Sequence, residues 1–240
     1  MKKTILGLLL LIPSTCFAYG TNGCDSSTVL LIHCNGAPAS TSFSESDCQG
    51  NGAIAITAQA DSKIDATGKF EQSVILDGTG DYLQSATIGT TFSGDFTVDF
   101  WVNFATDISA LTTDLYDDNA SFTNFSARIQ ATVRDLFIGG NEYTFGLWTP
   151  TAGTWYHVAI VRSGSTVTWY QDGVSQGTAT DTSTPTVGVM NFAFRVGIGE
   201  YLNGELDEIR VSTRAQWTAN FTPPTSQYCS GCEMMGALWA

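Results

Sequence analysis

The sequence predicts an all-β protein in which two antiparallel sheets pack face to face. Apolar and polar residues alternate over several short segments, as they do in half-buried strands. Turn-forming pairs such as Asp77–Gly78 and Asn203–Gly204 separate these segments, and the chain contains 24 glycines. Many short strands divided by turns favour a sandwich or a barrel.

The first strands can be justified in chain order. Residues 96–104 alternate between an apolar face that begins at Phe96 and a mixed face that includes Trp101, which predicts one strand. Residues 122–136 fit both a helical and an alternating repeat, and the strand-rich surroundings favour strand. Residues 155–162 are apolar on both faces, which is typical of a central strand.

The later segments follow the same pattern. Residues 167–170 are rich in β-forming side chains and end at the turn Asp172–Gly173. Residues 192–198 alternate again, and residues 206–211 predict a further strand, whereas the polar residues 40–52 predict a loop. The chain has no internal repeat and no dividing linker, so we expect one domain.

The first 18 residues are typical of an export signal. Lys2 and Lys3 precede an apolar run over residues 5–12, and small residues at Cys16 and Ala18 predict cleavage after Ala18. The run is shorter than the roughly 20 residues that cross a bilayer. A membrane anchor and a lipoprotein signal at Cys16 are the alternatives.

The chain is acidic throughout. Its formal charge is −13, and removal of a signal that contains two lysines and no acid leaves −15. A field of this sign argues against nucleic acid as a partner. No second long apolar stretch follows the signal, so we expect no membrane span in the mature chain.

Five cysteines remain after the predicted cleavage, and an exported chain enters a compartment where disulfides form. An odd number leaves at least one thiol free or paired between chains. The sequence does not determine the pairing, although disulfides between the two ends of the chain would link the termini of a sandwich covalently. The Cys-x-x-Cys spacing near the C-terminus also matches redox and zinc motifs. The candidates are Cys24, Cys34, Cys48, Cys229 and Cys232.

Several segments carry a family pattern in a fixed order. They are residues 29–36, 76–83, 96–102, 155–174, 204–211 and 217–224. Together they resemble the laminin-G-like, concanavalin A-like lectin/glucanase family of bacterial and phage proteins. The resemblance implies a two-sheet antiparallel jelly-roll sandwich over residues 28–225. Residues 19–27 then form an N-terminal segment and residues 226–240 a cysteine-containing tail.

This fold occurs in lectins, glycosidases and adhesion modules, so the resemblance alone does not define an activity. Glucan hydrolases of this fold carry acidic side chains on one strand that point into a groove. Glu205 and Asp207 share a face here, but Arg210 stands where the third acid would be. His33 and His157 have no nucleophile pattern beside them, so we expect no catalytic residues.

The resemblance further implies a structural calcium ion where the first and last strands meet an early turn. Asp207 would supply a carboxylate, and Asp77–Gly78 and the first strand near Asn35 would supply further oxygens. Relatives often have Asp where this chain has Asn35, and the change removes one negative charge. The alternative is that both aspartates hold backbone N–H groups of their turns.

A glycan site would need exposed aromatic rings beside planar polar groups. The mixed face of residues 96–104 is expected to form the open side of a sheet, with further candidates on neighbouring strands and at a loop tip. The alternative is that these rings are ordinary packing. The candidates are Trp101, Asp99, Asn103, Arg128, Trp148 and Tyr170.

These inferences predict an exported, non-catalytic module that recognises glycan or another cell-surface ligand in adhesion or attachment. A structural or protein-interaction module of phage type is the second hypothesis. A divergent glycoside hydrolase is the third.

Overall fold

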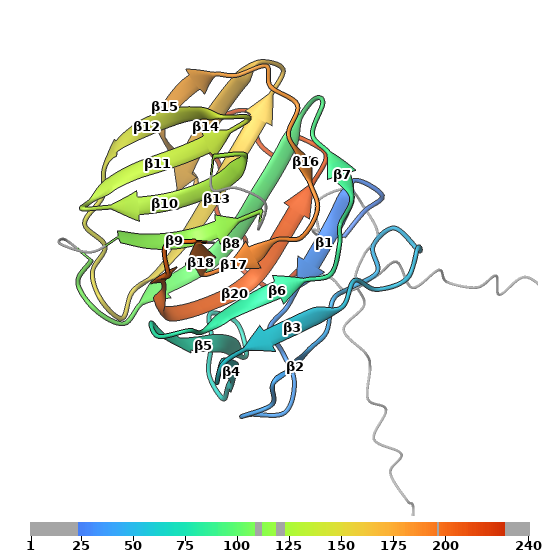
Figure 1. Ribbon diagram of the computed structural model, residues 1–240, viewed down its shortest axis with the longest axis vertical. Coiled ribbons are helices and arrows are strands. Elements are labelled where there is room, and N and C mark those ends of the chain that lie inside the picture. Colours follow the sequence, from blue (N-terminus) through green and yellow to red (C-terminus); the bar gives the residue numbers. More distant parts are fainter. Residues whose placement is uncertain (1–23, 109–111, 119–122, 196, 229–240) are drawn as a thin grey trace, which may run out of the picture.

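The computed structural model describes residues 24–108, 112–118, 123–195 and 197–228. Within these residues the chain forms 20 β-strands and no helix (Figure 1), which confirms the all-β prediction. A helix with the length and apolarity needed to cross a membrane is therefore absent from this part of the chain. The predicted signal at residues 1–18, most of residues 19–27, and residues 229–240 with Cys229 and Cys232 lie outside the described residues.

The first of the two large sheets has eight antiparallel strands. Their order is β15-β14-β13-β8-β20-β5-β4, and β1 also pairs with β20. The strands are β1 (Thr28–Ile32), β4 (Lys63–Asp65), β5 (Ser73–Asp77), β8 (Phe96–Phe104), β13 (Trp155–Ser163), β14 (Thr166–Gln171), β15 (Val174–Thr180) and β20 (Asn203–Ser212).

The second sheet also has eight strands, in the order β12-β11-β10-β9-β17-β6-β3-β2. The strands are β2 (Ser42–Phe43), β3 (Ile56–Gln59), β6 (Tyr82–Ser85), β9 (Thr112–Asp117), β10 (Phe125–Gln130), β11 (Val133–Ile138), β12 (Asn141–Leu147) and β17 (Asn191–Phe192). Two short pairs complete the fold, namely β7 (Thr90–Thr91) with β16 (Thr186–Val187) and β18 (Phe194–Arg195) with β19 (Glu200–Tyr201).

The two sheets lie one over the other, with β9 to β12 in front of β8, β13 and β14 (Figure 1). This is the two-sheet antiparallel jelly roll that the sequence predicts. The core fills the space between them because each strand is apolar on one face. On β8 the alternating side chains from Phe96 to Phe104 are buried, and the rings of Phe96 and Phe125 meet edge to face at 5.2 Å.

Residues 122–136 were the ambiguous segment, and their described part is strand. Positive φ angles of 44° at Ala131 and 78° at Thr132 form the turn that separates β10 from β11. The alternation along this segment therefore reflects a hairpin that places Phe125, Ala127 and Ile129 in the core.

Residues 192–198 do not form the single strand that their alternation predicts. β17 ends at Phe192, Ala193 has a φ of 74°, and the chain then turns into the β18–β19 pair. Gly197 and Gly199 adopt φ angles of 81° and 75°, which other residues rarely adopt, so the segment turns back on itself.

The chain leaves β20 as a C-terminal strap, defined here as residues 213–228, which crosses the outer face of the first sheet. Near its start, the Thr97 hydroxyl donates to the carbonyl of Arg214 at 2.7 Å. Further along, the Phe221 N–H donates to the carbonyl of Gly173 at 2.9 Å. The strap packs over Ala159, Val161 and Tyr170, which form a second, smaller apolar cluster outside the main core.

Candidate binding surface

The strap lies over part of the face that was predicted to bind glycan. Asp99 and Trp101 point to the outer side of β8, as the alternation requires, but Trp101 is only 5% exposed and Asp99 is fully buried. The Lys69 ammonium lies 3.9 Å from the centre of the Trp101 ring, and Phe70 meets that ring edge to face at 5.8 Å. The expectation of an open sheet side is therefore wrong, because the strap and a loop cover it.

A charged network lies between this face and the strap, with the Asp99 carboxylate at its centre. Arg210 Nε donates to it at 2.8 Å, the Tyr228 hydroxyl donates at 2.5 Å, and His157 Nε2 lies 3.3 Å away. Burial by itself raises the pKa of Asp99, but the Arg210 charge and His157 outweigh it and hold this pKa below its usual value.

Glu208 fixes the end of the strap to the first sheet. Its carboxylate accepts the backbone N–H of Tyr228 at 2.6 Å and lies 2.7 Å from His33 Nδ1. Glu208 reaches both groups because a bulge gives it a φ of 51° in the middle of β20. The end of the strap is thus anchored by side chains from β8 and β20, namely Asp99 and Glu208.

The remaining predicted glycan residues do not share one surface. Arg128 is on β10 of the second sheet and pairs with Asp135 at 3.2 Å, so it lies on the opposite side of the sandwich from Asp99. Trp148 follows β12 but is buried against Phe104, whose ring meets it edge to face at 5.5 Å. Asn103 and Tyr170 share the outer face of the first sheet with Trp101, and Tyr170 packs under Phe221.

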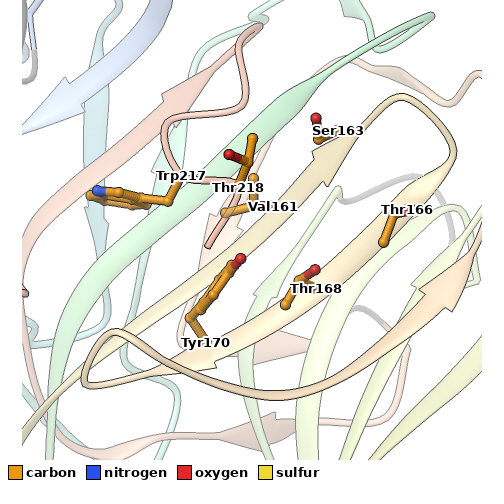
Figure 2. A pocket seen from close by; sticks show the side chains of 7 residues that line it. All are labelled: Val161, Ser163, Thr166, Thr168, Tyr170, Trp217 and Thr218. Carbon is orange, nitrogen blue, oxygen red and sulfur yellow. The ribbon is translucent and has the colours of Figure 1, made fainter. Parts of the chain in front are cut away.

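A pocket of about 220 Å³ opens beside the strap on the outer face of β13 and β14. Figure 2 shows side chains from both strands facing strap residues across it. The lining residues are Val161, Ser163, Thr166, Thr168, Tyr170, Trp217 and Thr218. Tyr170 was predicted for a binding surface, whereas the threonines and Ser163 were missed. Alternation along β14 is the only signal for Thr166 and Thr168, and no pattern marks Ser163 of β13 or Thr218 of the strap.

The chemistry of this pocket is neutral and polar. Five of its lining residues carry hydroxyl groups, which both donate and accept hydrogen bonds, and none carries a carboxylate, an amine or an imidazole. The Trp217 ring stacks on Phe221 with centroids 3.9 Å apart and planes 5° apart, so an aromatic edge borders the hydroxyls. A pocket below roughly 300 Å³ suits a small ligand or one unit of a larger one.

The residues predicted to hold calcium are separated in the structure. Asn203 lies opposite Asp77 and Leu206 opposite Val74, so Asp207 is displaced from Asp77 by about four residues, or roughly 13 Å. Asp207 accepts the N–H of Phe70 at 3.2 Å. Burial, followed by repulsion from Glu208, raises the pKa of Asp207 to about 8. The Asn35 amide donates to Gln227 at 2.9 Å, so the predicted set does not form one site.

Asp77 instead belongs to an acidic group at the turns around β5 and β6. Carboxylate oxygens of Asp61, Asp77 and Asp81 all lie within 4.8 Å of one another. The buried Asp81 carboxylate also accepts the N–H groups of Asp61 and Asp77, each at 3.0 Å. Three closely spaced carboxylates are the hard oxygen donors that Ca²⁺ prefers, so this set fits a calcium ion.

The acids considered for hydrolysis lie on β20 away from the pocket. Glu205 accepts the Ser73 hydroxyl at 2.7 Å, and Asn103 also donates to it at 3.5 Å. Asp207 is buried beneath the loop that contains Phe70. Both carboxylates therefore bind groups of the protein itself, and neither lines the described pocket beside the strap.

Of the cysteines that the structure describes, Cys24 and Cys48 form a disulfide and Cys34 is free and buried. The bridge ties the N-terminal segment to the loop of residues 44–55. A second pocket of about 240 Å³ lies beside it, but its acids Glu45 and Asp47 already accept backbone N–H groups of Leu31, Ile54, Asn51 and Gly52.

Two facing antiparallel sheets of eight strands each define a jelly-roll β-sandwich. The sequence model of the concanavalin A-like lectin/glucanases superfamily matches residues 77–218, more than half of the chain. The chain belongs to this superfamily, as the laminin-G-like segments predicted. No curated protein sequence matches it.

Solved structures similar to the chain support the fold. The binding domain of Paraclostridial Mosquitocidal Protein 1 is 14% identical with a TM-score of 0.61, and the match covers 79% of this chain and 49% of that one. The receptor binding domain of botulinum neurotoxin D is 9% identical with a TM-score of 0.63, covering 79% and 50%. The chain thus spans about half the length of these toxin domains.

A third similar structure is matched over almost its whole length. It is domain 4 of AbnA, an extracellular arabinanase of family GH43 from Geobacillus stearothermophilus, in complex with arabinotriose. It is 17% identical with a TM-score of 0.60, and the match covers 79% of this chain and 93% of that one. At these identities the similarity establishes a common fold.

Proposed function

We propose that this protein is an exported, non-catalytic binding module that holds a neutral saccharide in the pocket between the strap and β13–β14, in adhesion or attachment. The pocket lining carries the proposal, because it offers five hydroxyl groups and an aromatic edge without a charged group. Sugar hydroxyls both donate and accept, so they match such a lining. The acidic chain also repels anionic ligands.

The comparisons support a saccharide as the ligand class. A similar structure was solved in complex with arabinotriose, and others are described as receptor binding domains. Export is supported by the predicted signal and by the Cys24–Cys48 bridge, since disulfides persist in oxidising compartments. Absence of cleavage is supported by the place of Glu205 and Asp207, which bind Ser73 and Phe70 rather than facing the pocket.

A protein partner is the second candidate. Leu147 and Val174 are 72% and 52% exposed, although both are large apolar side chains. Exposed apolar residues at a sheet edge are a common feature of protein interfaces. A pull-down that recovers one partner, together with no binding to any saccharide, would favour this function.

We also propose that calcium binds the Asp61, Asp77 and Asp81 carboxylates and stabilises the fold, rather than taking part in recognition. The three carboxylates lie at turns that connect strands of both sheets, so an ion there would hold the sheets together.

Removal of pocket hydroxyls tests the saccharide proposal. We expect the parent to bind a subset of a glycan array that includes arabinotriose. Thr168→Val preserves the shape of a buried β14 side chain and removes one hydroxyl, so affinity should fall by about 1 kcal/mol, roughly fivefold. Thr57→Val, at an exposed site on the second sheet, is the matched control and should bind like the parent.

A parent that binds no saccharide on the array would contradict the proposal. So would equal affinities of the parent and Thr168→Val for a saccharide that binds.

A further inference from the structure

The outer face of the first sheet contains polar atoms that stay unpaired beneath the strap and the neighbouring loop of Lys69 and Phe70. Trp101 Nε1, His157 Nδ1 and Arg210 Nη2 are buried and have no hydrogen-bond partner in the described part of the chain. Asn103 Oδ1, on the same side of β8, is a buried acceptor that also has no hydrogen-bond partner among the described residues. Native interiors leave few such groups, so the strap over His157 and Arg210 and the loop over Trp101 cover this face without satisfying its polar atoms.

These groups have the character of a saccharide-binding face. An indole ring lies beside a guanidinium, an imidazole and an amide, and the unpaired atoms include both donors and an acceptor. Trp101 and His157 rings meet at 5.2 Å, which places these groups on adjacent strands of one face. Hydroxyls of a sugar would satisfy both kinds of atom at once.

The strap covers this face with rings. Trp217 and Phe221 stack on each other, and each meets the His157 ring edge to face, at 5.6 Å and 5.7 Å. The Arg210 guanidinium lies 5.3 Å from the Trp217 ring and 4.2 Å from the Tyr228 ring. Aromatic contacts of this kind are weaker and less directional than a strand ladder.

The strap is attached to the sheet at separate points. No strand forms within residues 213–228, and the Phe221 N–H to Gly173 carbonyl bond is followed by Pro223 and Pro224, which have no N–H to donate. The Ser175 N–H donates to the Asn220 side chain at 3.0 Å beside it. Release of the Gly173 and Ser175 contacts together would therefore loosen the middle of the strap.

We propose that the strap is a releasable cover over the His157 and Arg210 part of a second saccharide-binding face, which Trp101 and Asn103 continue along β8. This inference rests on the proposed function, because the same strap contributes Trp217 and Thr218 to the pocket. The strap rings occupy the surface on which a sugar would lie, so ligand and strap compete for it.

Gly173→Ala tests the cover directly. A Cβ atom at Gly173 would lie 1.9 Å from the carbonyl oxygen of Phe221, so the strap has to move. Gly164→Ala is the matched control, because Gly164 sits at the other turn of β14 with a φ of 60° against 75°, and a Cβ there meets nothing within 4 Å. Both variants thus carry similar turn strain, and only one disturbs the strap.

Two readouts follow in the full chain. Tryptic cleavage after Arg214 should be at least tenfold faster in Gly173→Ala than in Gly164→Ala. Binding to the same glycan array should increase at least tenfold for some oligosaccharide, and adding Trp101→Phe, which removes the indole N–H, should reverse the gain. Phe221→Ala should reproduce both effects and replaces Gly173→Ala should that variant not fold.

Rapid cleavage without any gain in saccharide binding would overturn the inference. Protease resistance equal to that of the parent in both strap variants would also overturn it, because the strap would then be a permanent part of the fold. The proposed function fails separately, through a parent that binds nothing or is indifferent to Thr168→Val. Binding by Gly173→Ala alone would support the covered face and contradict the pocket.

Discussion

At the scale of single residues, the Asp114 carboxyl is a group that is costly to bury. It lies on β9 opposite Arg128 of β10, is fully buried, and neither of its oxygens has a hydrogen-bond partner among the described residues. Burial, followed by the neighbouring Glu200 carboxyl, raises the pKa of Asp114 to about 9. Folding therefore requires Asp114 to take up a proton at neutral pH.

Replacement of this carboxyl gives a pH-dependent prediction. The unfolded pKa is near 3.8 and the folded pKa is about 9, so parent stability should fall as pH rises from 4 to 9. Over this range the free energy of unfolding should fall by up to about 1.4 kcal/mol per pH unit. Asp114→Asn should lack this component and should melt several degrees above the parent at pH 8.

Thermal melting between pH 5 and pH 9 provides the measurement. Glu71→Gln, at an exposed site, is the control and should follow the parent curve. A variant Asp114→Asn whose melting temperature lies below that of the parent at every pH would show that the carboxylate is paired.

Residue identities in the candidate site were predictable only in part. Alternation places Asp99 and Trp101 on the outer face of β8, and the structure agrees. Alternation does not show what lies on that face. Part of the cover comes from the strap residues Trp217, Phe221 and Tyr228, more than 100 positions along the chain, and the rest comes from the loop of Lys69 and Phe70. No local pattern connects either of them to β8.

At the scale of elements, the turns between strands and the Cys24–Cys48 disulfide hold the sandwich together. The calcium residues were predicted from separate segments, and only Asp77 lies in the acidic group that the structure forms. The reason is register: β5 and β20 pair so that Asp77 and Asp207 are at different heights along the strands. Register depends on the partner strand, and a single strand's pattern does not reveal it.

Calcium removal tests whether the turns that contain Asp61, Asp77 and Asp81 bind an ion. The parent should melt several degrees higher in 1 mM CaCl₂ than in EDTA, because a ligand that binds only the folded chain adds about 2.7 kcal/mol at 100 times its Kd. Asp61→Asn and Asp77→Asn should lose the shift. Asp207→Asn should keep it, and its loss there instead would place the ion at the site that the family resemblance implied.

Reduction of the disulfide tests the N-terminal element. The bridge joins residues 24 positions apart, and a loop of this length stabilises the fold by about 3 kcal/mol through the unfolded chain. Urea unfolding with and without reductant should show this loss in the parent. The double variant Cys24→Ala, Cys48→Ala should match the reduced parent and should not respond to reductant. An unchanged midpoint in the reduced parent would contradict a stabilising role.

At the scale of the whole molecule, the fold was predictable because period-two alternation and turn pairs repeat along the chain. β8, β13 and β20 lie where those patterns put them. The strand predicted over residues 192–198 is the exception, because Gly197, together with Gly199 just beyond it, allows a tight turn in an alternating segment. The pocket was not predictable, since it forms only where the strap meets β13 and β14 across the sequence.

The central claim is that the molecule binds a neutral saccharide and leaves it intact. Proton NMR of the parent with an oligosaccharide that binds on the array measures both parts in one sample. We expect saturation transfer to the intact sugar, weaker transfer in Thr168→Val, and no new anomeric signals after a day. New anomeric signals that disappear in Glu205→Gln, or no transfer to any oligosaccharide, would contradict the claim.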